Sequence, residues 1–218
     1  QSRPAVVKRI ADLAFETRPS LLVHAGDLVT TGGDKGHWTN HFFPNMRPLI
    51  ERVAIMPVLG NHEQDAKLYY DYMSLPDPER WCSFSYGDAD FFMIDGNRSL
   101  AQQSEQLAWL DRALSASRAK WRFAVLHQPP YTSDSNDYGD TTLTSSTRGD
   151  MNVRNIVRLL EEHGVDLIGA DPDTIDLAED RQRFKDAMIE IGVGVADSGL
   201  ATTLAEAEAL LDMVGMPA

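Results

Sequence analysis

The sequence predicts an α/β layered domain. Helical and strand patterns alternate along most of the chain, a β-hairpin interrupts the alternation, and an acidic helical stretch follows it. With 218 residues, 43% of them apolar, the chain is long enough for one sizeable domain with a hydrophobic core, or for one domain and an appendage.

Apolar periodicity defines the individual elements. Apolar side chains spaced three or four residues apart predict helices, as Val6, Ile10 and Leu13 do, and short apolar or alternating runs predict strands. In chain order we expect a helix at 5–16, a strand at 20–26, a Pro-interrupted helix at 45–53, a strand at 54–60, a helix at 66–74, a hairpin of 82–87 and 90–95, a helix at 104–117, a strand at 121–127, a long polar loop at 128–147, a helix at 152–163 and a strand at 165–168.

The acidic tail predicts two more helices. The stretch 174–191 carries Phe184 and Met188 at helical spacing. The stretch 203–214 opens with Thr203 and has Glu206 three residues later, which is a capping-box pattern. We interpret both as a solvated helical appendage rather than as a functional unit.

Charge and composition exclude several classes of protein. The formal net charge of -13 argues against nonspecific nucleic-acid binding, which requires clustered Lys and Arg. Cys82 is the only cysteine, so it cannot form an intrachain disulfide. No apolar run is long enough to span a bilayer, and the first residues lack the layout of a signal peptide.

Polar residues follow three of the predicted strands directly. Asp27 follows the first strand, Asn61 and His62 follow the second, and His127 follows the strand at 121–127. Because ligands of open α/β sheets lie beyond the carboxyl ends of the strands, we expect these side chains to share one edge. Gly26 and Gly60 allow the tight turns that would expose them.

The side chains at this edge suit a divalent transition metal. Carboxylate, amide oxygen and imidazole are ligands for Mn, Fe or Zn. A pair of such ions clamps a phosphoryl group and lowers the pKa of bound water. Asp27 is the natural bridge, since its two oxygens can serve two ions, while Asn61 and His127 would each give one donor to one ion. Each signal alone is weak, because lone histidines at strand ends are often structural.

In combination, the segments "AGDLV", "GNHE" and "VLHQPPY" resemble three successive motifs of the calcineurin-like metallophosphoesterases, and "RWCSFSYGDADFFMID" resembles the branch related to purple acid phosphatases. The resemblance covers about residues 6–168. It implies a layered α/β/β/α sandwich, incomplete at both ends, with a C-terminal helical appendage. It also implies two divalent or trivalent transition metal ions (Fe, Mn or Zn) as cofactors, a small phosphate ester as substrate, and a secreted or periplasmic location.

The resemblance assigns a role to each residue at the edge. Asp27 matches the bridging ligand, and Asn61 and His127 match ligands of the second metal. His62 matches the histidine beside the scissile phosphate, which stabilises charge or protonates the leaving oxygen. Glu63 would lie behind the ligands and orient His62.

Two family motifs are missing. The Asp-containing motif that should precede the first strand has no counterpart, because Asp12 is the only aspartate in residues 1–19 and lies within a helical pattern. The final Gly-His-x-His motif is replaced by Gly169, Ala170, Asp171, Pro172 and Asp173. Only one ion, or none, would then be bound. Thr30 stands where purple acid phosphatases have tyrosine, so an iron-tyrosinate chromophore is not expected.

From about Val165 the segments "VDLIGADPDTIDLAEDRQRFKDAMIEIGV" and "SGLATTLAEAEALLDMVGMP" resemble the large subunit of carbamoyl-phosphate synthase at the start of an ATP-grasp unit. By that resemblance Arg181 would contact a nucleotide. We therefore expect a metallophosphoesterase-like domain at 1–168 and an acidic helical segment at 169–218, joined by a fusion or a chimeric reading frame. A natural phosphoesterase with a replaced C-terminal lobe is the less favoured origin, because the final metal motif is lost without visible compensation.

Three functions stay open at this stage. The first is a dinuclear phosphoester hydrolase that activates water for in-line attack, with His62 near the leaving group. The second is a catalytically impaired fragment or chimera that acts at most as a weak single-metal binding domain. The third is a nucleotide-binding ligase fragment, which only the tail supports.

Overall fold

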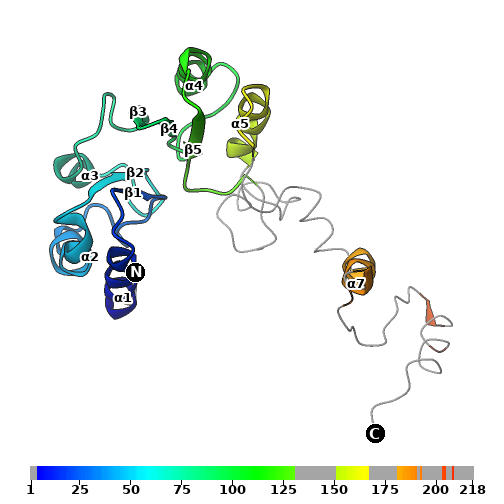
Figure 1. Cartoon of the computed structure of the whole chain (residues 1–218), viewed down its shortest axis with the longest axis horizontal. Coiled ribbons are helices and arrows are strands. Elements are labelled where there is room, and N and C mark those ends of the chain that lie inside the picture. The colour runs from blue at the N-terminus through cyan, green and yellow to red at the C-terminus, as the bar shows by residue number, and fades with distance from the viewer. Residues whose placement is uncertain are drawn as a thin grey trace, which may run out of the picture.

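The computed structural model describes residues 4–130, 151–166, 181–190, 192, 203, 204 and 208. Two small sheets lie between two groups of helices, which gives the order helix, sheet, sheet, helix (Figure 1). The α/β layered sandwich predicted from the sequence is confirmed.

The first half of the sandwich surrounds a two-stranded sheet. Strands β1 (Leu21–His24) and β2 (Ala54–Pro57) are parallel, with Leu21 opposite Ala54 and His24 opposite Pro57. The helices of this half are α1 (Pro4–Glu16), the π-helix η1 (His37–Phe42), α2 (Phe43–Ile50) and α3 (Lys67–Tyr72).

The second half contains a three-stranded sheet. Strands β3 (Cys82–Tyr86) and β4 (Ala89–Met93) form the predicted antiparallel hairpin, and β5 (Trp121–Val125) lies parallel to β4. The helices are α4 (Glu105–Ala116) and α5 (Met151–Glu162). The Oγ atom of Ser104 caps α4 by accepting a 3.3 Å hydrogen bond from the backbone N–H of Leu107.

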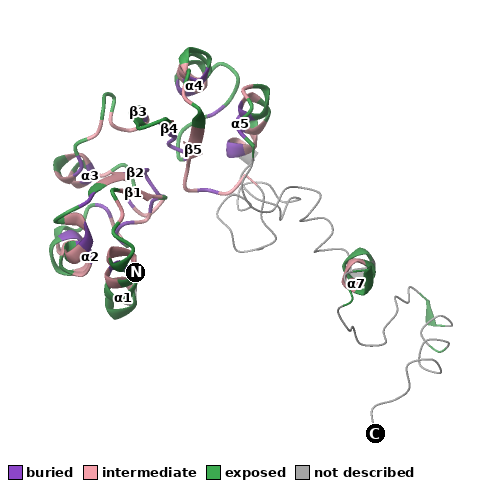
Figure 2. Cartoon of the chain, viewed as in Figure 1, coloured by how far each residue is buried: buried purple, intermediate pink, exposed green. Residues whose placement is uncertain are grey.

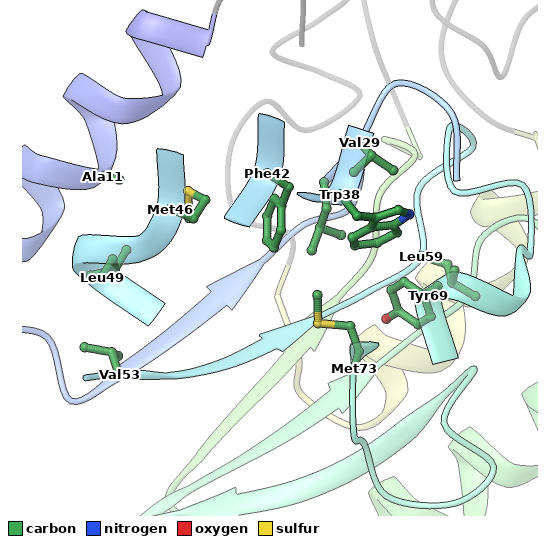
Figure 3. Packing of buried hydrophobic residues seen from close by; sticks show 11 residues of the cluster. Ala11, Val29, Trp38, Phe42, Met46, Leu49, Val53, Leu59, Tyr69 and Met73 are labelled. Carbon is green, nitrogen blue, oxygen red and sulfur yellow. The ribbon is translucent and has the colours of Figure 1, made fainter. Parts of the chain in front are cut away.

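Each half has a core of its own, where helices cover the outer face of a sheet (Figure 2). In the first core, Trp38, Phe42 and Tyr69 gather over β1 and β2 (Figure 3). Trp38 is fully buried, and its indole N–H donates a 2.8 Å hydrogen bond to the carbonyl of Gly32, which fixes the loop after Asp27. In the second core, buried residues of α4 and α5 pack on β4.

A third cluster joins the two sheets. Val58, Cys82 and Met93 are buried, and side chains from every strand pack against them, namely Val23, Met56, Phe84, Phe91 and Val125. Since the sheets pack face to face through this layer, the loops at their edges are held at fixed separation. The packing of the two sheets thus fixes how far apart the loops after β1, β2 and β5 lie.

The structure departs from the expected elements in a few places. The π-helix at 37–42 was not predicted, and α2 ends at Ile50 rather than at residue 53. Of the predicted strand at 165–168, Val165 and Asp166 are described and lie outside any strand. The rest of that strand, the polar loop from 131 onward and most of the helix at 203–214 lie outside the described residues.

The tail contributes one described helix, α7 (Arg181–Glu190), which falls within the predicted helical stretch. Phe184 is 44% exposed and Ile189 is 53% exposed. Across the described residues, no helix has the length and apolar character needed to cross a membrane.

Candidate metal centre

The loops after β1 and β2 approach each other closely at two glycines. Gly26 has a φ of 87°, and a Cβ atom there would lie 2.8 Å from the backbone nitrogen of Gly60. A Cβ atom at Gly60 would lie 2.1 Å from Oδ1 of Asp27. Only glycine fits both positions, so the two loops touch without intervening side chains.

Asp27 is held in an uncommon backbone conformation. Its φ of 55° lies in the left-handed region that non-glycine residues seldom adopt. Such conformations persist where the surroundings fix them, and they are concentrated at functional sites. The backbone N–H of His62 donates a 3.1 Å hydrogen bond to Oδ1 of Asp27, which leaves Oδ2 facing the site.

Three candidate ligand atoms meet at the edge of the sheets. The Nε2 atom of His127 lies 3.0 Å from Oδ1 of Asn61 and 3.4 Å from Oδ2 of Asp27. The structure thus brings together the three residues that the sequence nominates as metal ligands, although they come from loops up to 100 residues apart.

A hydrogen bond to the backbone of Ala25 orients the ring of His127. Its Nδ1 atom lies 2.8 Å from the carbonyl oxygen of Ala25, and because a carbonyl only accepts, Nδ1 carries the proton. The Nε2 atom of the neutral ring then presents a lone pair toward two oxygen acceptors. Three lone pairs that converge in this way require a cation, either a proton on Nε2 or a metal ion.

The charges of this group reinforce one another. The hydrogen bond with Asp27 raises the pKa of His127 above its ordinary value, against the opposing effect of burial. Burial works against ionisation of Asp27, but the hydrogen bonds from His127 and from the backbone of His62 outweigh it, and the pKa of Asp27 is lowered. The interaction between the two side chains thus favours the protonated form of His127 and the ionised form of Asp27.

His62 lies beside Asp27. Its Nδ1 atom donates to the carbonyl oxygen of Thr30 at 2.7 Å, and its Nε2 atom lies 4.0 Å from Oδ2 of Asp27. The side chain is 34% exposed. Because Nδ1 is engaged with Thr30, Nε2 is the ring nitrogen that faces Asp27.

Glu63 is fully buried behind the candidate ligands. Its Oε2 atom accepts hydrogen bonds from the backbone N–H groups of Asp27 at 2.9 Å and Gly60 at 2.7 Å, and its Oε1 atom accepts one from Val29 at 3.1 Å. Burial raises the pKa of Glu63, although these three donors oppose that effect. Its contacts hold the two ligand loops together, which is a broader role than orienting His62.

The donor set fits a metal ion chemically. Two ligands that bind one ion at right angles and at about 2.1 Å lie about 3.0 Å apart, close to the 3.0 Å and 3.4 Å between the ligand atoms here. Within the described ranges, no group of three or more His, Cys, Asp or Glu side chains forms a metal site, and the third donor of this set is the amide oxygen of Asn61.

Two further residues of the site were not found from the sequence. Asn97, after β4, donates a 3.3 Å hydrogen bond to the carbonyl of Gly60, and Gln128, directly after His127, donates a 2.8 Å hydrogen bond to Asn97. The sequence could have indicated Asn97, because the strand β4 ends at the same edge of the sheets and the segment Asp95–Asn97 follows that strand directly. The predicted contact residue Arg181 begins α7, and its role stays a prediction.

These observations define a layered α/β fold that brings Asp27, Asn61 and His127, the candidate metal ligands, together at the carboxyl edge of its strands. The calcineurin-like phosphoesterase family model matches residues 1–170, and the chain belongs to that family. The structure is similar to that of purple acid phosphatase from yellow lupin (Lupinus luteus) seeds, with a TM-score of 0.62 and 16% identity over 75% of this chain and 32% of that one. This likeness supports the fold.

A second set of relatives matches a short stretch. The chain is 55% identical over 60 residues to the carbamoyl phosphate synthase large chain of Myxococcus xanthus, and 58% identical over 52 residues to that of Ralstonia nicotianae. These matches span 28% and 24% of this chain, but only 6% and 5% of the relatives. Both resemblances recognised in the sequence are confirmed.

Proposed function

We propose that the chain is a phosphoester hydrolase with a dinuclear metal centre at the edge formed by Asp27, Asn61 and His127. The observation that carries the proposal is the convergence of two oxygen ligands on the unprotonated Nε2 position of His127. Family membership supplies the reaction class.

Each residue of the site would have a separate role in metal binding or proton transfer. Asp27 would bridge the ions, and Asn61 and His127 would bind one of them. When bound, such ions polarise the phosphate and lower the pKa of water. His62 is fixed by Thr30, so its Nε2 atom can hold a proton for the leaving oxygen.

The substrate class is a small phosphate ester. The net charge of -13 disfavours binding to a polyanion such as nucleic acid through the protein surface. An acidic protein can still bind one phosphate group when metal ions supply the positive charge.

The test combines metal content with turnover. The purified chain is incubated with Mn, Fe or Zn, dialysed, and analysed by mass spectrometry, and hydrolysis of p-nitrophenyl phosphate is then measured. About two ions per chain with turnover support the proposal. Asp27→Asn keeps the shape of the side chain but loses its charge. We expect this variant to lose both metal binding and turnover. Asp12→Asn is the matched control, because Asp12 lies on α1, where its half-buried side chain pairs with Lys8.

A second candidate is a catalytically impaired fragment or chimera that acts at most as a weak single-metal binding domain. The replacement of the last family motif by residues 169–173, and the short matches to carbamoyl phosphate synthase, favour it. One ion per chain or none, without turnover, would select this candidate over the first. About two ions per chain with turnover would contradict it.

We also propose that residues 169–218 form a separate acidic helical segment that corresponds to the synthase match, with Arg181 as its nucleotide contact. The identity of the matched relatives and the helix α7 support it. The test is ATP binding to the whole chain and to Arg181→Met, and binding that is lost in the variant would support the role of Arg181. ATP binding that is equal in wild type and variant would contradict the role of Arg181.

A further inference from the structure

Asn97 lies between the two loops that carry the metal ligands Asn61 and His127. Its Nδ2 atom donates toward the carbonyl oxygens of Gly60 at 3.3 Å and Leu59 at 3.5 Å, just before Asn61. Its Oδ1 atom accepts a 2.8 Å hydrogen bond from Nε2 of Gln128. One side chain therefore contacts both loops.

Asn97 is itself anchored to a buried carboxylate. Oδ1 of Asp95, a residue that is 1% exposed, accepts hydrogen bonds from the backbone N–H of Asn97 at 3.0 Å and from its Nδ2 atom at 2.9 Å. The backbone N–H of Asp95 donates a 2.8 Å hydrogen bond to Oε1 of Gln106 on α4, and its carbonyl oxygen accepts a 3.0 Å hydrogen bond from Nε2 of the same residue. The position of Asn97 is thus fixed by a helix.

The direction of each amide in this network is determined by its partners. The carbonyls of Leu59 and Gly60 only accept, so Nδ2 of Asn97 must face them and Oδ1 must face Gln128. Gln128 must then donate through Nε2, and its buried Oε1 atom has no hydrogen-bond partner among the described residues. The fold tolerates this unsatisfied atom, whose burial is unfavourable, while it keeps the contact with Asn97.

We propose that Asn97 is a positioning residue that sets the separation between Asn61 and His127. The inference rests on the proposed function, because the separation matters only if both side chains bind one ion. Asn97 touches neither ligand side chain in any contact described above. It acts on the backbone of Gly60 and, through Gln128, on the loop of His127.

The first test uses hydrogen exchange of the metal-free chain. In Asn97→Ala we expect the exchange of amides in 58–63 and in 124–128 to rise about fivefold or more, the factor that the loss of one hydrogen bond produces in an opening equilibrium. Asn97 is exposed on its outer side, so the variant should still fold, and far-UV circular dichroism verifies this.

Asn152→Ala is the matched control. Asn152 also fixes the loop after β4, through the carbonyls of Gly96 at 3.1 Å and Arg98 at 2.7 Å and the N–H of Leu100 at 2.8 Å. We expect faster exchange only around 96–100. Asn97→Asp keeps the acceptor for Gln128 but loses the donors to Gly60, so exchange should rise in 58–63 alone.

The second readout is the dissociation constant for Mn, measured by titration calorimetry. We expect Asn97→Ala to weaken binding about tenfold to a hundredfold, as is typical for residues that orient ligands, and Asn152→Ala to leave it unchanged. An Asn97→Ala variant whose exchange rises only in 95–100 would overturn the inference. A wild-type chain that binds no Mn would overturn the proposed function, while hydrogen exchange would still decide the role of Asn97.

Discussion

The carboxylate of Glu63 accepts a 2.9 Å hydrogen bond from the backbone N–H of Asp27, and the same oxygen accepts another of 2.7 Å from Gly60. One buried atom therefore joins the loop that carries the proposed bridging ligand to the loop that carries Asn61. The loops cannot separate without leaving backbone donors unpaired in the interior.

We expect Glu63→Ala to reduce the free energy of unfolding by about 3 kcal/mol or more, because three backbone N–H groups lose their acceptor at about 1–3 kcal/mol each. Urea unfolding of the metal-free chain measures this. Glu51→Ala is the control, since Glu51 is 52% exposed and pairs only with Arg47 in the described contacts of its side chain. Equal effects of the two substitutions would contradict the role of Glu63.

The close approach of Gly60 to Asp27 gives a second prediction. In Gly60→Ala the new Cβ atom would lie 2.3 Å from the nitrogen and 2.1 Å from Oδ1 of Asp27, so the two loops must move apart. We expect a loss of about 1–3 kcal/mol in the free energy of unfolding, typical of overpacking, and weaker Mn binding.

Gly33→Ala is the matched control for this substitution. A Cβ atom at Gly33 meets nothing within 4 Å, so we expect no loss of stability and unchanged Mn binding. If Gly60→Ala behaved like Gly33→Ala in urea unfolding, the two loops would not be in contact in solution.

Sequence reasoning succeeded where the determining interactions are local. The apolar spacing of Val6, Ile10 and Leu13 specified α1, and strand ends placed Asp27, Asn61 and His127 at one edge. The π-helix was missed because its hydrogen-bonding pattern leaves no distinct period in six residues.

The contacts behind the ligands could not be predicted. Glu63 bonds to Asp27, 36 positions away, and Asn152 bonds to Leu100, 52 positions away. Such pairs depend on how the two sheets pack, and no spacing in the chain encodes them. The roles assigned to His62 and to the three ligands therefore stay predictions until metal binding is measured.

A cluster near the site gives a prediction about pH. Burial raises the pKa of Asp65, but the hydrogen bond from Tyr70 and the charges of Arg80 and Arg98 outweigh it, so its pKa lies below the ordinary value of 3.8. A lowered pKa in the folded state means that ionised Asp65 stabilises the fold above that value, and that the stabilisation is lost as the pH falls through the folded pKa.

Asp65→Asn should therefore be less stable than wild type at pH 7, and the difference should shrink steadily below about pH 4, near the ordinary pKa of the unfolded residue. Urea midpoints at pH 7 and at pH 3.5 test this. Asp71→Asn, which removes only a surface pair with Lys67, should change the midpoint little at pH 7. If the stability difference between wild type and Asp65→Asn grew on acidification, the pKa of Asp65 would not be lowered in the folded state.

The proposed division of the chain at residue 168 can be tested with two phenylalanines. Phe92 on β4 is 2% exposed and packs between α4 and α5, whereas Phe184 on α7 is 44% exposed. Phe92→Ala should cost about 3–5 kcal/mol in the free energy of unfolding, while Phe184→Ala should change it by less than about 0.5 kcal/mol. Both are measured by urea unfolding of the whole chain. A large loss in Phe184→Ala would mean that α7 packs against the phosphoesterase domain, and the tail would then belong to the same cooperative unit.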